Sequence, residues 1–260
     1  EHPISNGSGE SDAVGIGWSE DVHIVNCELH DAHNVLQVWW HAAADGAVID
    51  NCDIYAHYYL TDCNGNFQPG TGQCGNEDHI ELKSGGSPAN PARIIHNRLW
   101  GGRSTDLILS GYDDGGGGSM IFWAGYSDVN DDHRNAVWWL TQDNILFDAV
   151  QGGGSYWFET NGNPAQLSFV GNLVYLMRPS ANPLRPGGGD GLRWFKKSNS
   201  EAYLNTFIDC ETAWLSLGWS ATNHDNRGNL AILSGAAALE GTMDGAVIDY
   251  NAFYGTPPTT

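Results

Sequence analysis

Short apolar stretches, each interrupted by an asparagine, recur along this chain. Residues 22–30 and 47–55 are alike, and their asparagines, Asn26 and Asn51, stand 25 positions apart. Asn97 follows a similar stretch after a longer interval. Copies of the pattern cover residues 22–30, 47–55, 92–100, 167–175, 202–207 and 246–254. Repetition at a period of about 20–50 residues is typical of solenoids and other repeat folds.

A second class of apolar segment lies between these copies, and several of its members alternate apolar and polar residues as a half-buried strand does. The segments are 12–18, 35–40, 78–84, 106–111, 155–160, 191–196 and 213–219. A rung of about 22–28 residues that holds two or three short strands is the unit of a parallel β-helix. Gaps close to 46 residues are then two rungs, or one rung with a long loop.

The recurrence predicts an all-β fold, a single-stranded right-handed parallel β-helix that spans residues 1–260 as one domain. Asparagine tolerates a left-handed backbone, and it can hydrogen-bond to another asparagine in the next turn. We therefore expect Asn26, Asn51 and Asn97 to stack in the interior. Long loop insertions rich in Gly, Asp, Asn or Pro are expected at 60–77, 112–135, 178–190 and 220–242. A β-sandwich or a propeller would not repeat an asparagine at this interval.

Composition limits the partners. The chain has 260 residues, a net charge of −20 and only 11 Lys and Arg, so it repels nucleic acid and anionic membranes. No apolar run reaches the roughly 18 residues of a membrane helix. An anionic polysaccharide would need Ca²⁺ or a local basic cluster in order to bind. The 11 Trp include candidates for sugar-stacking platforms, although a core position is the commoner role.

The five cysteines are Cys27, Cys52, Cys63, Cys74 and Cys210. Cys63 and Cys74 bracket a polar loop that a disulfide would close, and such a bond indicates an oxidising compartment. Cys210 is expected to be a small buried apolar side chain. The spacing of the cysteines does not match a zinc site.

Residues 11–27 resemble the rung of pectate lyases that carries an Asp-Ala start and ends in a Cys, and residues 45–52 look like a second such rung. The likeness implies a pectate-lyase-like β-helix. Rung patterns of this kind are shared by lyases, hydrolases, tailspikes and adhesins, so they specify the fold far better than the activity.

A narrower resemblance is to the alginate lyase and chondroitinase B family. Members carry a Lys-Ser, then an Asn, then an Arg at the end of the next strand. Lys83 and Asn97 follow that order, whereas Ser110 stands at the arginine position. The resemblance implies Lys83 as base and an arginine that neutralises the uronate. Arg103 or Arg98 is then the candidate for that role.

β-Elimination removes the proton beside a uronate carboxylate, so it needs a base and a cation near the carboxylate. Glu81 and Lys83 face the same side of an extended strand. A carboxylate there favours the charged ammonium, which suits an outward pair that solvates the sheet rather than a catalytic base.

If Ile80 and Leu82 point inward, His79 points out with Glu81 and Lys83. Trp157 and Glu159, and later Arg193 or Lys196, would extend this column at steps of about 4.8 Å, so that a sugar polymer lies along it. Glu81 and Glu159 are alternatively the acid and base of a glycoside hydrolase, for which carboxyls about 5–9.5 Å apart are required.

Calcium is a candidate cofactor, since loops rich in glycine carry several carboxylates. The candidate ligands are Asp113, Asp114, Asp128, Asp131 and Asp132.

These patterns lead to one functional expectation and two alternatives. The expectation is an extracellular or cell-surface protein that acts on polysaccharide, as a lyase on a uronate-containing glycan. The first alternative is a non-catalytic surface, adhesive or filament-forming protein that self-associates through the open ends of the β-helix. The second is the glycoside hydrolase.

Overall fold

The structure is a computed structural model. The described residues are 12–17, 20–30, 32, 34–38, 45–56, 78–101, 119–123, 137–149, 151–155, 165–178, 189–195, 199–222, 224–234, 238–244 and 247–255. All regular elements in these ranges are β-strands, and each sheet pairing is parallel. No described segment forms a helix long and apolar enough to cross a membrane.

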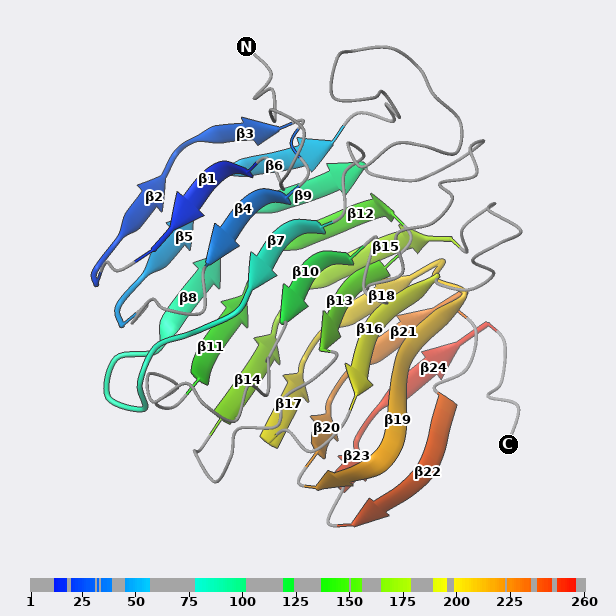
Figure 1. The fold of residues 1–260 in the computed structure, drawn as a ribbon. Helices are drawn as coiled ribbons and strands as arrows, with labels where there is room; N and C mark the ends of the chain where they lie inside the picture. Colours follow the sequence, from blue (N-terminus) through cyan, green and yellow to red (C-terminus); the bar gives the residue numbers. More distant parts are fainter. Residues whose placement is uncertain are drawn as a thin grey trace, which may run out of the picture.

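The chain passes through three sheets in turn and repeats this circuit eight times, which confirms the predicted parallel β-helix (Figure 1). Sheet A contains β1 (Asp12–Ile16), β4 (Asn34–Val38), β7 (Asp78–Leu82), β10 (Ser119–Trp123), β13 (Gln151–Ser155), β16 (Asp190–Phe195), β19 (Thr212–Thr222) and β22 (Ala238–Asp244). Sheet B contains β2 (His23–Val25), β5 (Val48–Asp50), β8 (Ala92–Ile95), β11 (Val137–Gln142), β14 (Ala165–Val170), β17 (Asn199–Tyr203), β20 (His224–Arg227) and β23 (Val247–Asp249). Sheet C contains β3 (Glu28–His30), β6 (Asp53–Ala56), β9 (Arg98–Gly101), β12 (Ile145–Ala149), β15 (Leu173–Met177), β18 (Thr206–Ile208), β21 (Leu230–Ile232) and β24 (Ala252–Tyr254).

Two predicted insertions contain strands. β10 lies inside the expected insertion at 112–135, and β20, β21 and part of β22 lie inside the one expected at 220–242. The 46-residue interval from Asn205 to Asn251 is therefore two coils, while the interval from Asn51 to Asn97 is one coil with a long connection. The strand expected at 106–111 falls outside the described residues.

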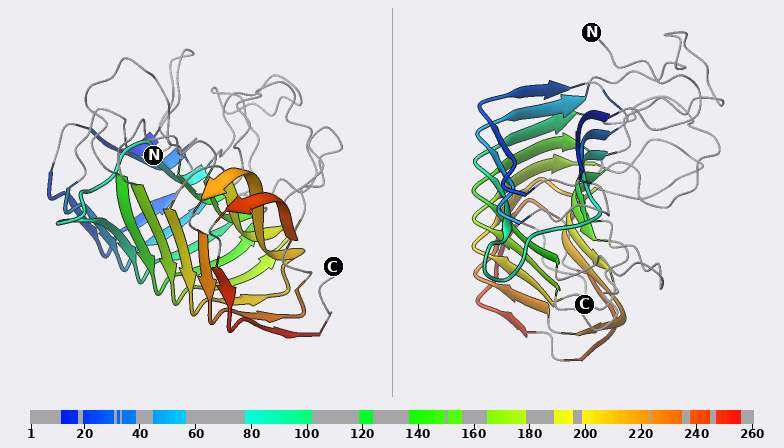
Figure 2. Two further views of the ribbon diagram at one scale, coloured as in Figure 1. Left: turned by 90° about the horizontal axis from the view of Figure 1, so that it is seen from below. Right: turned by 60° about the vertical axis from the view of Figure 1, so that its left-hand side comes forward.

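The interior is an apolar column because successive coils place the same strand position above one another (Figure 2). Sheet B contributes Ile49, Ile94 and Phe169, and sheet C contributes Leu99 and Phe207, all fully buried. The Trp123 ring from sheet A and the Phe169 ring pack edge to face, with centroids 6.3 Å apart. Burial of apolar surface at about 25 cal/mol per Å² is the main force that holds the coils together.

The corner between sheets B and C has the same backbone in all eight coils. One residue per coil is left-handed there, with φ between 52° and 67°. These residues are Asn26, Asn51, His96, Asp143, Gly171, Leu204, Gly228 and Tyr250. A left-handed residue costs a non-glycine side chain about 1–2 kcal/mol, so the surrounding pairings must impose this conformation at Leu204 and Tyr250.

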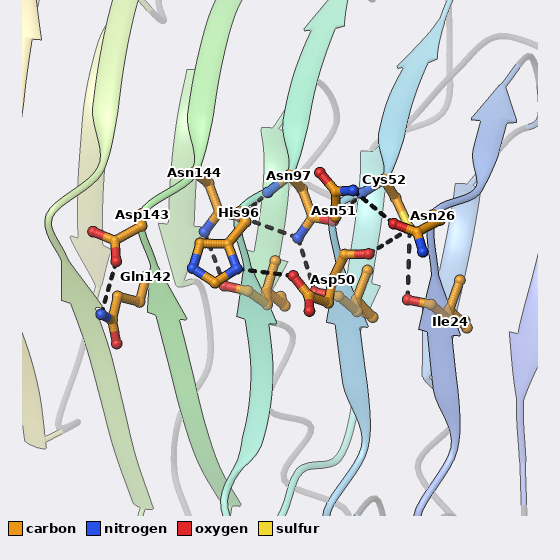
Figure 3. A network of polar contacts seen from close by, with 12 residues as sticks. Ile24, Asn26, Asp50, Asn51, Cys52, His96, Asn97, Gln142, Asp143 and Asn144 are labelled. Carbon is orange, nitrogen blue, oxygen red and sulfur yellow. Dashed lines mark hydrogen bonds and ion pairs between the residues drawn. The ribbon is translucent and has the colours of Figure 1, made fainter.

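An asparagine ladder runs one position after this corner. Asn97, Asn144 and Asn172 are buried, and each donates its main-chain N–H to the side-chain Oδ1 of the next coil at 2.8–2.9 Å (Figure 3). Each side-chain Nδ2 donates to a main-chain carbonyl of the preceding coil, as from Asn144 to Ile94 O at 2.9 Å. The ladder continues through Asn205, Asn229 and Asn251.

The predicted stacking was therefore wrong in register for two of its three residues. Asn51 does stack on Asn26, donating Nδ2 to Oδ1 at 2.6 Å, but both lie at the exposed left-handed corner (Figure 3). Asn97 belongs to the interior ladder, in which Cys52 and Cys27 occupy the first two positions. Asparagine suits both positions, for its tolerance of left-handed backbone at one and for its amide at the other.

Candidate polar site on sheet A

A buried cluster of polar side chains lies on β4 and β7 of sheet A. Gln37 and Glu81 pair in register, while the pairs on either side, Leu36 with Ile80 and Val38 with Leu82, belong to the apolar core. Since successive strand side chains alternate between the two faces, Gln37 and Glu81 face away from that core. They are nevertheless 0% and 7% exposed, as is usual only for polar groups that have partners.

The Glu81 carboxylate receives three donors. Asn34 Nδ2 donates to Oε2 at 3.1 Å, Gln37 Nε2 donates to the same oxygen, and Lys83 Nζ lies 3.1 Å from Oε1. The exposed fractions of the two charged side chains are 11% for Lys83 and 10% for Glu81. A carboxylate and an ammonium removed from water need this kind of mutual compensation, because either alone would be costly to bury.

Lys83 follows the end of β7, and its main-chain N–H donates to Val38 O at 2.9 Å. The Glu81–Lys83 proximity predicted by strand alternation is present, but the pair is largely buried and does not simply solvate the sheet. In this arrangement Lys83 is a hydrogen-bond donor.

His79 extends in a different direction from the one predicted. Its Nε2 contacts Trp100 O of β9 at 2.7 Å, and the residue is 2% exposed, so it joins sheet A to sheet C. Because a carbonyl oxygen only accepts, Nε2 carries the proton. Burial lowers the pKa of His79 to about 4, the hydrogen bond to Trp100 opposing the shift. The imidazole is neutral near pH 7.

Arg98 lies on β9 of sheet C. It forms a bidentate ion pair with Asp53, in which Nε donates to Oδ1 at 2.6 Å and Nη2 donates to Oδ2 at 2.5 Å. Its guanidinium lies 5.8 Å from the centroid of the Trp100 ring. Lys83 is on sheet A. The structure thus places these two predicted site residues on different sheets.

An aromatic stack on the outer face of sheet C was not foreseen. The rings of His30, Tyr55, Trp100, Phe147 and Tyr175 stack in sequence with centroids 4.5–5.7 Å apart and interplanar angles of 4–13°. The sequence repeat could have predicted this stack, because four of the five residues are the last residue of a repeat copy. Ring faces turned toward one another are not open to a sugar, so the stack is a structural feature of the sheet.

Several predicted site residues fall outside the described part of the chain. They are Arg103, Trp157, Glu159, Lys196, the calcium candidates Asp113, Asp114, Asp128, Asp131 and Asp132, and the disulfide candidates Cys63 and Cys74. The backbone of Arg193 is described, and its strand position shares the Glu81 column, since both connect through Phe122 and Gly154. Three coils separate them, about 14 Å at about 4.8 Å per coil.

Within the described ranges, no three His, Cys, Asp or Glu side chains gather in a way that could hold a metal ion. Cys27, Cys52 and Cys210 are free thiols. Comparisons with protein-family models, with curated proteins and with solved structures find no match to this chain.

Proposed function

We propose that this protein is an extracellular β-helix of the pectate-lyase-like kind that binds polysaccharide on sheet A. The observation that carries the proposal is the buried cluster of Asn34, Gln37, Glu81 and Lys83 on the side of the sheet that faces away from the core. Amides, a carboxylate and an ammonium are the groups that hydrogen-bond to sugar hydroxyls, and the ammonium also suits a uronate carboxylate.

The parallel sheet suits a polymer ligand. Equivalent positions on sheet A repeat at about 4.8 Å from coil to coil, and the register column that contains Glu81 passes through Phe122 and Gly154 to the position of Arg193. A net charge of −20 opposes a polyanion, so a uronate glycan would bind with Lys83 as its local cation or with Ca²⁺ as a bridge. Binding to an anionic glycan should therefore weaken as salt is added.

Cleavage by β-elimination is the reaction that we propose for this site, with Lys83 as base and Arg103 as the carboxylate partner. It requires the glycan to separate Lys83 from Glu81, because the amine is paired at 3.1 Å in the free protein. A glycoside hydrolase that uses Glu81 and Glu159 is the remaining alternative. For that reaction the Glu81 carboxylate would have to give up the hydrogen bonds that it now accepts from Asn34, Gln37 and Lys83.

Affinity electrophoresis tests binding. Native gels that contain pectate, alginate, chondroitin or a neutral glucan should retard the protein in at least one case, with and without Ca²⁺. Glu81→Gln should lose the retardation, because the carboxylate that organises the cluster is gone. Asp53→Asn, which breaks the similar pair on sheet C, should keep it. Unretarded migration in every gel, or wild-type binding by Glu81→Gln, would remove the basis of the proposal.

Cleavage needs a separate readout. The unsaturated product of β-elimination absorbs in the ultraviolet, and hydrolysis yields reducing ends without this absorbance. Lyase activity should disappear in Lys83→Met, because the proposed base is gone. Binding with neither product identifies a non-catalytic glycan-binding protein.

The outer face of sheet C favours a second candidate, a non-catalytic protein that associates with copies of itself. In the later coils this face presents Leu173, Ile208 and Ile232, with Leu204 and Leu233 at its corners 69% and 61% exposed. Isolated apolar side chains are common on surfaces, but a contiguous group marks an interaction site. Sedimentation velocity should show association that Leu204→Lys with Leu233→Lys abolishes, and a monomer at all concentrations would exclude it.

The end of the helix offers another route to self-association. The last described coil carries Ile248 and Phe253 at inward strand positions, and they are 40% and 36% exposed. An unpaired strand edge can add a strand from another copy. Filaments in electron micrographs that persist in the double lysine variant would assign association to this end and not to sheet C.

A further inference from the structure

The asparagine ladder changes its chemistry in the first two coils. Cys27 and Cys52 take the position that asparagine occupies in the six later coils, as the register of β2, β5 and β8 requires. Cys52 N–H still donates to Asn97 Oδ1 at 2.9 Å, so the ladder reaches Cys52 from its asparagine side. Beyond that point no amide side chain continues it.

Thiols replace the amide poorly at these positions. Cys27 N–H points at Cys52 Sγ at 3.4 Å, and the Cys52 thiol lies 3.3–3.5 Å from Asp50 O and Ile24 O. Sulfur is a weak acceptor and S–H a weak donor, whereas each later asparagine forms short N–H···O bonds to both neighbouring coils. Coils 1 and 2 are therefore joined less well by hydrogen bonds than the coils that follow.

The same register holds the two cysteines where a covalent bond can form. They occupy equivalent positions on adjacent parallel coils, whose Cα atoms are about 4.8 Å apart, within the range of about 4.4–6.8 Å found for disulfides. Cys27 N–H lies 3.4 Å from Cys52 Sγ, and burial raises the pKa of Cys52. Cys52 is 1% exposed, while Cys27 on the first coil is partly exposed. Cys27 is thus the thiol that an oxidant reaches first.

We propose that Cys27 and Cys52 form a disulfide that joins coils 1 and 2, and that the structure holds this pair in its reduced form. The oxidant is a small disulfide of the glutathione class. The Cys27 thiolate attacks one sulfur of that molecule and releases a thiol. Cys52, once deprotonated, attacks the resulting mixed disulfide and releases the second thiol. Two protons and two electrons pass from the protein to the oxidant, which leaves as two thiols.

The sequence allows a clear mass-spectrometric test. Cleavage before each aspartate places Cys27 in peptide 21–30, Cys52 in peptide 50–52, and both Cys63 and Cys74 in peptide 62–77. The protein is equilibrated in glutathione disulfide, quenched in acid, alkylated under denaturing conditions and digested. Peptides 21–30 and 50–52 should appear joined, lighter by two hydrogens than their sum, and should separate and alkylate after reduction.

Two variants distinguish this bond from general oxidation. Oxidation should raise the thermal midpoint of the wild type and of Cys210→Ser by more than that of Cys27→Ser, in which only the predicted Cys63–Cys74 bond can still form. Each variant is compared with its own reduced form, so that a change in its basal stability does not affect the result. Singly alkylated Cys27 and Cys52 after oxidation would overturn the proposal, as would a link from either to Cys63 or Cys74.

Discussion

Removal of one amide from the middle of the ladder should cost far more than removal of one from the surface corner. Asn144 accepts Asn97 N–H at 2.8 Å and donates to Ile94 O at 2.9 Å and to Asn172 Oδ1 at 3.0 Å. Asn144→Ala leaves the buried Asn97 N–H without its acceptor and takes one donor from Ile94 O. A buried group that loses its partner costs about 1–3 kcal/mol, so we expect a loss of about 3 kcal/mol in the free energy of unfolding.

Thermal unfolding followed by circular dichroism measures this cost. For a chain of this size about 1 kcal/mol corresponds to about 2–4 °C, so the midpoint of Asn144→Ala should fall by about 6–12 °C. The matched control is Asn26→Gly, which removes an exposed amide pair with Asn51 and keeps the left-handed corner. It should cost less than about 1 kcal/mol. Equal shifts in the two variants would refute the assignment of the interior ladder as the stabilising column.

Three further substitutions test individual contacts. His79→Gln should make the stability of the protein less sensitive to acid. The pKa of His79 is about 4 in the folded protein, below the ordinary 6.5, so His79 lowers the wild-type stability by about 3 kcal/mol as pH falls from 6.5 to 4. Thermal midpoints measured across that interval should therefore decline less steeply in the variant. Gly191→Ala should destabilise by about 1–3 kcal/mol in urea unfolding, because the added Cβ would lie 2.4 Å from a Phe207 ring carbon; an unchanged midpoint would contradict this packing. Asn226→Leu should raise the thermal midpoint, because the side chain of Asn226 is 1% exposed and both its amide atoms lack hydrogen-bond partners. The expected gain is about 1–3 kcal/mol, and a lower midpoint would disprove it.

The repeat in the sequence was sufficient to predict the fold, because Asn26-Cys27 and Asn51-Cys52 recur at an interval that fits one coil. It was insufficient to place the asparagines correctly. His96-Asn97 differs from Asn51-Cys52 only in which of two adjacent positions holds the amide. Both positions favour asparagine, and only the strand register separates them.

Variable connections hid other parts of the coil. The copy around Asn144 was missed because it lies 47 residues after Asn97, far more than one coil. The copy around Asn229 was missed although it lies 24 residues after Asn205 and 22 before Asn251, because its surroundings are rich in the polar and small residues of a loop. At the site, strand alternation was enough to bring Glu81 and Lys83 together. Asn34 and Gln37 could not be foreseen, since they precede Glu81 by 47 and 44 residues and meet it only through the register of β4 and β7.

The left-handed corner between sheets B and C has a consequence for the surface of the protein. Its bend is set by the backbone and by the ladder behind it, while side chains as different as those of Asn51, Leu204 and Tyr250 occupy it. Those of Leu204 and Tyr250 are mostly in solvent. The corner is thus a row of side-chain positions that repeat about every 4.8 Å. A side chain in this row can be replaced without a change in the spacing of the coils beneath it.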